Sequence, residues 1–132
     1  MTHETKIRVR YSETDRMGYV YYGNYPQYYE VARTEMMRSL GFAYKQLEDS
    51  GILMPVVAME IKYKKPAIYD DLLTIRTTLK KNPLIKAHFI YEVFNEKGEL
   101  LNIGSTTLVF VDAKTRKPCK APQYFYDALP LE

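Results

Sequence analysis

Apolar side chains recur every three or four residues between Asn24 and Gly41, which is the spacing of one face of an α-helix. They are Tyr25, Tyr28, Tyr29, Ala32, Met36 and Leu40. Asn24 is a favourable N-cap, Pro26 suits the first helical turn, and Gly41 is typical of a residue that ends a helix. The pattern therefore predicts one long helix. Its polar side is expected to carry Gln27, Arg33, Thr34 and Arg38.

Five other segments alternate apolar and polar residues with a period of two, and each predicts a β-strand. They are residues 6–11, 57–64, 73–79, 85–93 and 100–111. In the first, Ile7, Val9 and Tyr11 are expected on the buried face. The last is apolar on both faces near its end, which predicts a strand in the interior of the sheet.

Short turns separate the last four strands, at Asp70-Asp71, at Asn82-Pro83 and at 95–99. Short connections indicate antiparallel pairing, so we predict an α+β protein in which one antiparallel five-stranded sheet curls around a long central helix. A short helix is expected at 44–50, ended by Gly51, and an aromatic turn at 124–129. The open edge of such a sheet invites pairing with a second copy of the chain.

The 132 residues suit a single domain over 1–132, and a formal charge of +3 with dispersed Lys and Arg does not indicate nucleic-acid binding. One cysteine, a polar start and no long apolar run predict a cytoplasmic protein with no membrane span. No His, Cys and Asp residues have metal-ligand spacing, and no Gly-rich phosphate loop is present. We therefore expect neither a metal nor a cofactor.

A short acidic motif precedes the helix among many tyrosines. Thr14-Asp15 is followed by Gly18, Val20, Tyr22 and Tyr25 in the pattern T-D-x-x-G-x-V-x-[YH]-x-x-Y, and then by residues 32–35, A-R-T-E. These residues resemble the hotdog-fold acyl-CoA thioesterases of the 4-hydroxybenzoyl-CoA thioesterase type, and most of all the YbgC-like subgroup. The likeness continues at residues 63–67 and at Asp70-Asp71.

The resemblance implies a hotdog fold that hydrolyses the thioester of a short-chain or aromatic acyl-CoA, with Asp15 as nucleophile or general base. It also implies that the backbone N–H of Tyr22 polarises the carbonyl. These roles agree with the chemistry, because thioester hydrolysis needs a nucleophile or base and a donor where the oxyanion develops. A carboxylate beside a helix N-terminus lies next to such donors.

The expected substrate-binding residues are Gly18, Val20, Gly23, Tyr25 and Glu30. The two glycines would permit backbone turns near the ligand, and Glu30 matches an acid that contacts the substrate hydroxyl in the 4-hydroxybenzoyl enzymes. An ordinary helix-surface Glu is the alternative for Glu30. Many YbgC-like members carry His where this chain has Tyr22, so a catalytic His is not available there. Candidates for the phosphates of coenzyme A are Lys62, Lys64, Lys65, Lys80 and Lys81, although solvated strand faces explain them equally well.

The family also implies a homodimer whose two sheets join edge to edge, often paired into a homotetramer, with sites at the subunit interface. Two further readings stay open: an acyl-ACP thioesterase, and a non-catalytic acyl-CoA or acyl-carrier-protein binding module. A hotdog dehydratase would rely on a His with an acid, and the sequence has no His near Asp15. The intact Asp15 argues against a non-catalytic module, and an assay of thiol release separates the two.

Overall fold

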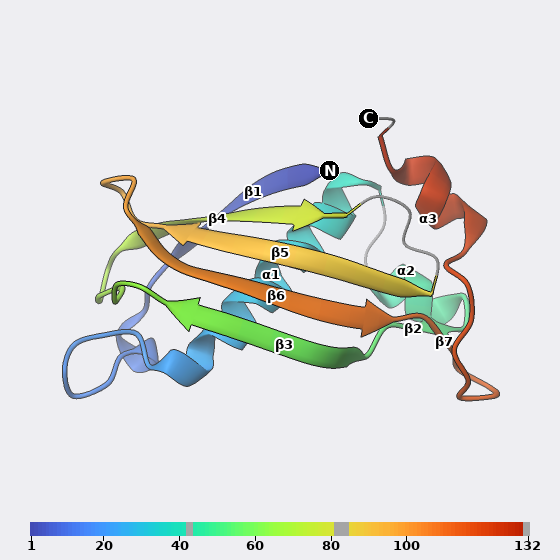
Figure 1. Cartoon of the computed structure of the whole chain (residues 1–132), viewed down its shortest axis with the longest axis horizontal. Coiled ribbons are helices and arrows are strands. Elements are labelled where there is room, and N and C mark those ends of the chain that lie inside the picture. Colours follow the sequence, from blue (N-terminus) through green and yellow to red (C-terminus); the bar gives the residue numbers. More distant parts are fainter. Residues whose placement is uncertain (42–43, 81–84, 131–132) are drawn as a thin grey trace.

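The computed structural model describes residues 1–41, 44–80 and 85–130. Its main sheet is antiparallel and five-stranded, in the order β1-β4-β5-β6-β3. The strands are β1 (Thr2–Arg8), β4 (Leu72–Leu79), β5 (Lys86–Phe94), β6 (Leu100–Val109) and β3 (Val56–Tyr63). The long helix α1 (Tyr25–Ser39) runs behind this sheet (Figure 1). The predicted α+β class, antiparallel five-stranded sheet and long helix are thus confirmed, and the arrangement is the one expected of a hotdog fold.

The core lies between α1 and the inner face of the sheet, where β4 and β5 bury alternate residues. Tyr29 of α1 is fully buried and stacks on Tyr91 of β5, with ring centroids 4.3 Å apart. A Cβ atom at position 104 would lie 2.4 Å from the Tyr29 ring, so β6 needs Gly104 there. The Tyr29 hydroxyl donates to Oδ1 of Asn102, 2.5 Å away. Burying a large side chain in this way contributes roughly 1.5–3 kcal/mol.

The first strand differs from the prediction of residues 6–11. It spans Thr2–Arg8, and Tyr11 lies in the 3₁₀ helix η1 (Tyr11–Glu13) with 78% of its surface exposed. The pairing explains the difference, because β1 pairs with β4 and β4 begins at Leu72, opposite Arg8. Val9 is buried, and its N–H donates to the carbonyl of Asp71 as the chain leaves the sheet.

Arg33 was expected on the polar side of the helix but is buried, with 8% of its surface exposed. Its guanidinium donates to the hydroxyl of Tyr91 at 3.5 Å, and that hydroxyl lies 2.6 Å from Oγ1 of Thr106. A long arginine side chain can therefore reach a hydroxyl in the sheet from the flank of the apolar stripe. Arg38 is exposed and pairs with Glu35, as expected for the polar side.

The alternation at residues 57–64 predicted a strand, and β3 forms there with almost all of its residues exposed. Val57 and Met59 keep 55% and 49% of their surface accessible. The reason is its place at the edge of the sheet, where it pairs only with β6. In Figure 1 it lies at the opposite edge from β1, the other outer strand.

The remaining elements follow the predictions more closely. The short helix α2 (Tyr44–Asp49) is followed by Gly51 with a φ of 90°, and α3 (Gln123–Ala128) occupies the expected aromatic turn. β6 is interior as predicted but ends at Val109, because β7 (Val111–Asp112) leaves it to pair with β2 (Ile52–Leu53). The predicted break at Asn82-Pro83 and residue Lys81 lie outside the described residues.

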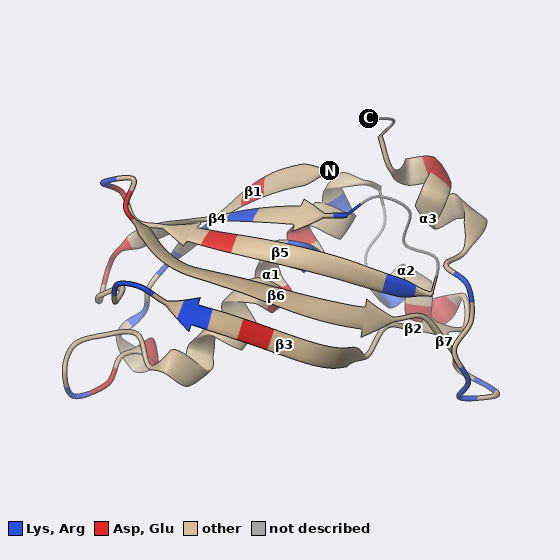
Figure 2. Ribbon diagram, viewed as in Figure 1, with Lys and Arg blue, Asp and Glu red and all other residues tan. Residues whose placement is uncertain are grey.

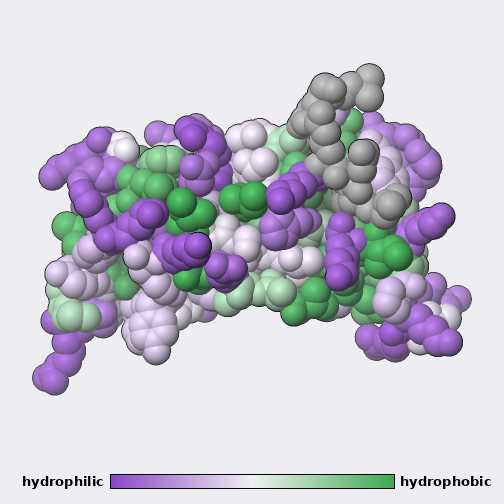
Figure 3. Space-filling view, viewed as in Figure 1, coloured by the Kyte–Doolittle hydropathy of each residue, from purple (hydrophilic) through white to green (hydrophobic). Residues whose placement is uncertain are grey.

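Lys and Arg are spread over several strands and loops rather than gathered in one place (Figure 2). On the face of the molecule turned to the viewer in Figure 3, apolar and charged side chains are interspersed. Among the residues that the structure describes, no helix is long and apolar enough to cross a membrane.

Candidate active site

Asp15 lies in a narrow loop between β1 and α1. Thr14 and Val20 form an antiparallel bridge, and the N–H of Asp15 donates to the carbonyl of Tyr19 at 2.8 Å. The N–H of Gly18 then donates to the carbonyl of Asp15 at 3.0 Å. Gly18 closes this turn with a φ of 78°, a conformation that glycine adopts without steric cost. The expected turn at Gly18 is therefore present.

The loop also fixes the carboxylate of Asp15. Its Oδ1 accepts hydrogen bonds from the N–H of Met17 at 2.9 Å and of Tyr19 at 3.3 Å. An Asp that bonds its own backbone two residues on is typical of a tight turn. In the described part of the chain no hydrogen-bond partner is found for Oδ2, which leaves that oxygen available to a substrate or a water molecule.

A hollow of about 310 Å³ adjoins Asp15. Its wall consists of Asp15, Met17, Tyr19, Val20, Tyr22, Tyr25, Tyr63, Lys64, Lys65 and Pro66. The hollow thus joins three parts of the fold: the Asp15 loop, the start of the long helix and the end of β3. The ring of Tyr63 lies 5.7 Å from that of Tyr25 and 6.5 Å from that of Tyr22, measured between centroids.

The start of the helix brings Tyr22 to this hollow. The 3₁₀ helix η2 (Tyr22–Asn24) leads directly into α1, and the first N–H groups of a helix have no partner within it. Among the described residues no acceptor is found for the N–H of Tyr22, whereas its carbonyl accepts from the hydroxyl of Tyr63 at 3.2 Å. The amide of Tyr22 is therefore a candidate donor to a developing oxyanion.

The expected N-cap at Asn24 does not form through its side chain. Asn24 already has helical backbone angles, φ −86° and ψ −16°, because η2 precedes it, so it lacks the extended conformation of a capping residue. Its Nδ2 instead donates to the carbonyl of Glu13 at 2.8 Å. The side chain thereby ties the helix start to the Asp15 loop.

Two of the phenols that line the hollow, those of Tyr25 and Tyr63, stay protonated at neutral pH. Burial raises the pKa of Tyr25. Burial and the neighbouring Tyr22 hydroxyl raise the pKa of Tyr63. Since an ordinary phenol has a pKa of about 10, both hydroxyls serve as hydrogen-bonding groups rather than as bases.

Four of the seven expected site residues line this hollow: Asp15, Val20, Tyr22 and Tyr25. Gly18 closes the loop beside it, while Gly23 lies within η2 and does not adopt the left-handed conformation of a turn glycine. Glu30 is exposed and borders a different hollow, of about 320 Å³, with Arg33 and Glu48. Within one chain, therefore, Glu30 and Asp15 do not share a hollow.

Tyr63 is the main residue of the site to which sequence reasoning gave no role. The likeness at residues 63–67 pointed to this segment, but the alternation assigned Tyr63 only to a strand. Lys64 and Lys65, two of the candidates for phosphate contacts, also line the hollow, and Lys65 pairs with Glu99 at 2.6 Å. Among the residues described, no group of three or more His, Cys, Asp or Glu is placed to hold a metal ion.

Comparison with known proteins identifies relatives over nearly the whole chain. The family model described as the thioesterase-like superfamily matches residues 9–129. YneP, a putative acyl-CoA thioesterase of Bacillus subtilis, is 38% identical over 122 residues, covering 92% of this chain and 88% of that protein. The acyl-CoA thioester hydrolase YbgC of Escherichia coli O157:H7 is 34% identical over 117 residues, covering 89% of this chain and 87% of that protein.

A solved structure gives the same result for the fold. The crystal structure of a DHNA-CoA thioesterase from Staphylococcus aureus matches with a TM-score of 0.88 and 40% identity. The match covers 96% of this chain and 85% of that one. Together these relatives confirm the resemblance drawn from the motif that begins at Thr14.

Proposed function

Because the chain belongs to the thioesterase-like superfamily and is a thioester hydrolase, we propose that it hydrolyses a short-chain or aromatic acyl-CoA at the Asp15 hollow. The observation that carries the proposal is the meeting of two groups at one aromatic hollow. One is the carboxylate of Asp15, held by two amides, and the other is the N–H of Tyr22 at the helix start. These are the two groups that acyl transfer needs.

Asp15 supplies the attack on the thioester carbon by one of two routes. As a general base it takes a proton from water, and the resulting hydroxide adds to the carbonyl carbon. As a nucleophile its oxygen adds to that carbon, and water later hydrolyses the acyl anhydride. In both routes the carbon–sulfur bond breaks, the thiolate takes up a proton, and the acyl group leaves as a carboxylate.

The N–H of Tyr22 stabilises the negative charge on the carbonyl oxygen during this attack. A backbone donor at the beginning of a helix carries partial positive charge and needs no reorganisation when the oxyanion forms. A backbone group also survives the replacement of the family's frequent His by Tyr22. The mechanism therefore does not require a catalytic histidine in this chain.

The size and lining of the hollow support a small acyl group. A volume of about 310 Å³ is at the lower end for ligand pockets, and tyrosine rings form much of the wall. Stacked or edge-on contacts with these rings favour an aromatic acyl group. Lys64 and Lys65 border the hollow and supply positive charge for the phosphates of coenzyme A, or for the phosphopantetheine of an acyl carrier protein in the alternative function.

We also propose that the protein assembles as a homodimer, or as a homotetramer of two such dimers, through the edge strand β3. Its exposed Val57 and Met59, and its unpaired backbone edge, are the features that a second copy would cover. Tyr63 and Lys64 connect this edge with the hollow.

Glu30 takes part in substrate binding only if a second copy brings its helix beside the hollow. The single cysteine fits a cytoplasmic location.

A thiol-release assay tests the proposed function. Short-chain, long-chain and aromatic acyl-CoAs should be compared with the corresponding acyl carrier protein thioesters. We expect the highest kcat/KM for short-chain or aromatic acyl-CoAs. Faster turnover of carrier-protein thioesters would favour the alternative substrate, and no thiol release from any of them would refute the proposal.

A further inference from the structure

Glu13 is a buried acid two residues before Asp15, with only 8% of its surface exposed. A buried carboxylate requires hydrogen bonds to offset its desolvation. Its Oε1 accepts from the N–H of Arg10 at 2.7 Å and from the hydroxyl of Tyr28 at 2.9 Å. Its Oε2 accepts from the guanidinium of Arg10 at 3.3 Å.

These bonds keep the carboxylate ionised. Burial alone would raise the pKa of Glu13, but the hydrogen bonds from Arg10 and Tyr28 outweigh it, so the pKa lies below its ordinary value. The side chain therefore holds a charge-assisted contact to Tyr28, which belongs to the buried face of α1.

The backbone carbonyl of Glu13 makes a second set of contacts. It accepts from the N–H of Tyr21 at 2.9 Å and from Nδ2 of Asn24 at 2.8 Å. Tyr21 directly precedes Tyr22, and Asn24 ends the 3₁₀ helix that Tyr22 begins. One residue thus bonds to both flanks of the candidate oxyanion donor and, through Tyr28, to the body of the helix.

Asp15 is also close to Glu13 along the chain, because only Thr14 separates the two residues. A displacement of Glu13 would move the Asp15 carboxylate relative to the N–H of Tyr22. Reactions that depend on two aligned groups are sensitive to such changes, and a 1 Å misplacement can cost about 10²-fold in rate.

We propose that Glu13 is the positioning residue of the thioesterase site, which sets the Asp15 carboxylate against the start of the helix. The inference rests on the proposed function of Asp15 and Tyr22. Glu13 does not line the hollow, so it acts through these two groups and not on the substrate.

Two substitutions of Glu13 separate positioning from chemistry. Glu13→Ala removes all three side-chain acceptor contacts, and kcat should fall on the order of 10²-fold with little change in KM. Glu13→Gln keeps Oε1, the oxygen that bonds both Arg10 N–H and Tyr28, and should retain most of the turnover with an unchanged pH–rate profile. A residue that acted as a base would lose its activity in both variants.

A matched pair of tyrosine variants tests the same contact without altering the loop. Tyr28→Phe removes the hydroxyl that donates to Glu13, whereas Tyr29→Phe removes a hydroxyl that donates to Asn102, away from the loop. Both positions are buried on α1, so both variants lose a buried hydrogen bond. We expect kcat to fall more in Tyr28→Phe than in Tyr29→Phe, with thermal unfolding as the control.

Three outcomes would overturn the inference: a folded Glu13→Ala enzyme with near-wild-type kcat, equal kcat in the two tyrosine variants, or a Glu13→Gln enzyme as inactive as Glu13→Ala. The tyrosine pair remains decisive if Glu13→Ala does not fold.

Asp15→Asn, assayed in parallel, separates the two proposals. An active Asp15→Asn enzyme would refute the role of Asp15 and positioning with it. An inactive one beside a fully active Glu13→Ala would refute positioning alone.

Discussion

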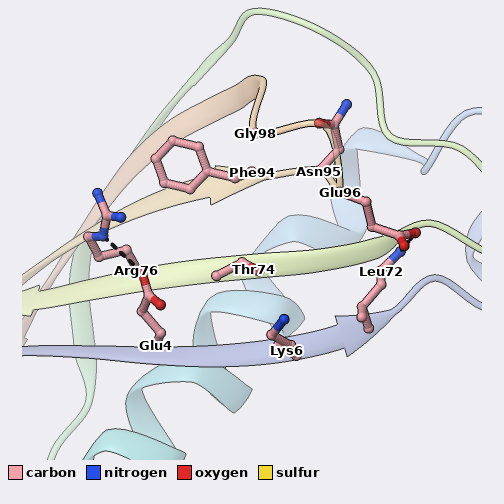
Figure 4. A pocket seen from close by; sticks show the side chains of 9 residues that line it. All are labelled: Glu4, Lys6, Leu72, Thr74, Arg76, Phe94, Asn95, Glu96 and Gly98. Carbon is pink, nitrogen blue, oxygen red and sulfur yellow. Dashed lines mark hydrogen bonds and ion pairs between the residues drawn. The ribbon is translucent and has the colours of Figure 1, made fainter.

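The Asp15 hollow is smaller than a hollow of about 510 Å³ on the outer face of the sheet, near the ends of β1, β4 and β5 (Figure 4). The lining of this outer hollow consists of Glu4, Lys6, Leu72, Thr74, Arg76, Phe94, Asn95, Glu96 and Gly98. Besides their volumes, the two hollows differ in whether their polar groups already have hydrogen-bond or ion-pair partners.

In the outer hollow two of the four charged side chains, Arg76 and Glu4, pair with each other. Nε of Arg76 lies 3.1 Å from Oε2 of Glu4, and its guanidinium lies over the ring of Phe94 at 5.0 Å. A carboxylate oxygen of Glu96 accepts from the N–H of Leu72 at 3.2 Å. Figure 4 shows the dashed contact between Arg76 and Glu4 across neighbouring strands.

The Asp15 hollow has the opposite character. It places an ordered carboxylate beside a helix start whose N–H has no acceptor among the described residues, and it surrounds both with aromatic rings. Polar groups without a partner in the described part of the chain, rather than volume, therefore distinguish the candidate site. Each prediction below tests this contrast, from the largest expected effect to the smallest.

Asp15→Asn should reduce thioester hydrolysis by on the order of 10²-fold or more, because the amide can neither attack nor accept a proton. The change is nearly isosteric, and Asn can still accept the amide hydrogen bonds within the turn, so the fold should persist. Glu4→Gln is the matched control, since it neutralises a carboxylate in the other hollow. Turnover by thiol release checks both variants, and a folded Asp15→Asn enzyme with near-wild-type turnover would remove Asp15 from the mechanism.

Met59→Lys should convert the proposed dimer into a monomer and lower activity with it. A lysine on an exposed edge strand disfavours edge-to-edge pairing, and the end of β3 forms part of the Asp15 hollow. Thr2→Lys adds the same charge to the opposite edge strand, β1, and should leave assembly unchanged. Light scattering at low micromolar concentration measures the mass. A wild-type monomer with full activity would contradict the proposal.

Tyr22→Phe should stay within roughly tenfold of wild-type turnover, because it keeps the backbone N–H, the ring and the helix start. Loss of a true oxyanion donor typically costs about 10²–10³ in turnover. A loss as large as that of Asp15→Asn, with an unchanged circular dichroism spectrum, would mean that the Tyr22 hydroxyl takes part in the reaction. The hydroxyl of Tyr22, rather than its backbone N–H, would then be the group that acts in the reaction.

The elements with one covered face were predictable from the sequence. α1, β4 and β5 bury regular stripes, so their periods of 3.6 and 2 are visible in the chain. β3 carries the same alternation as a buried strand, but its place at the edge depends on the order of strands in the sheet. The end of β1 at Arg8 was missed for the same reason, since it follows from where its partner β4 begins.

The residues of the candidate site were predictable in part. The motif around Asp15 identified the loop and the helix start, which are neighbours in sequence as well as in space. Tyr63 reaches the hollow from β3, about forty positions further along the chain, through sheet topology that local pattern does not reveal. Glu13 was hidden for a different reason: an acid in a loop suggests exposure, and only the fold shows that Arg10 and Tyr28 surround it.

Lowering the pH should weaken the hydrogen bonds that the Glu13 carboxylate accepts from Arg10 and Tyr28. Because the pKa of Glu13 is lowered in the fold, its ionised form adds stability above the ordinary pKa of a Glu, and this contribution is lost as the pH falls through the lowered value. Glu13→Gln carries no titrating group, so the stability difference from wild type should shrink between pH 6 and pH 3. Urea unfolding at several pH values measures it, and a constant difference would contradict the prediction.

Arg76→Gln should have the smallest effect. It breaks the contact with Glu4 and the cation–π contact with Phe94, but Arg76 and Glu4 both keep more than a third of their side-chain surface exposed. Pairs of this kind contribute about 0–1 kcal/mol, so the free energy of unfolding should fall by less than about 1 kcal/mol. Thiol release should match the wild type, because Arg76 pairs with Glu4 and does not line the Asp15 hollow. A loss of turnover comparable to that of Asp15→Asn, without a loss of stability, would show that the outer hollow belongs to the site.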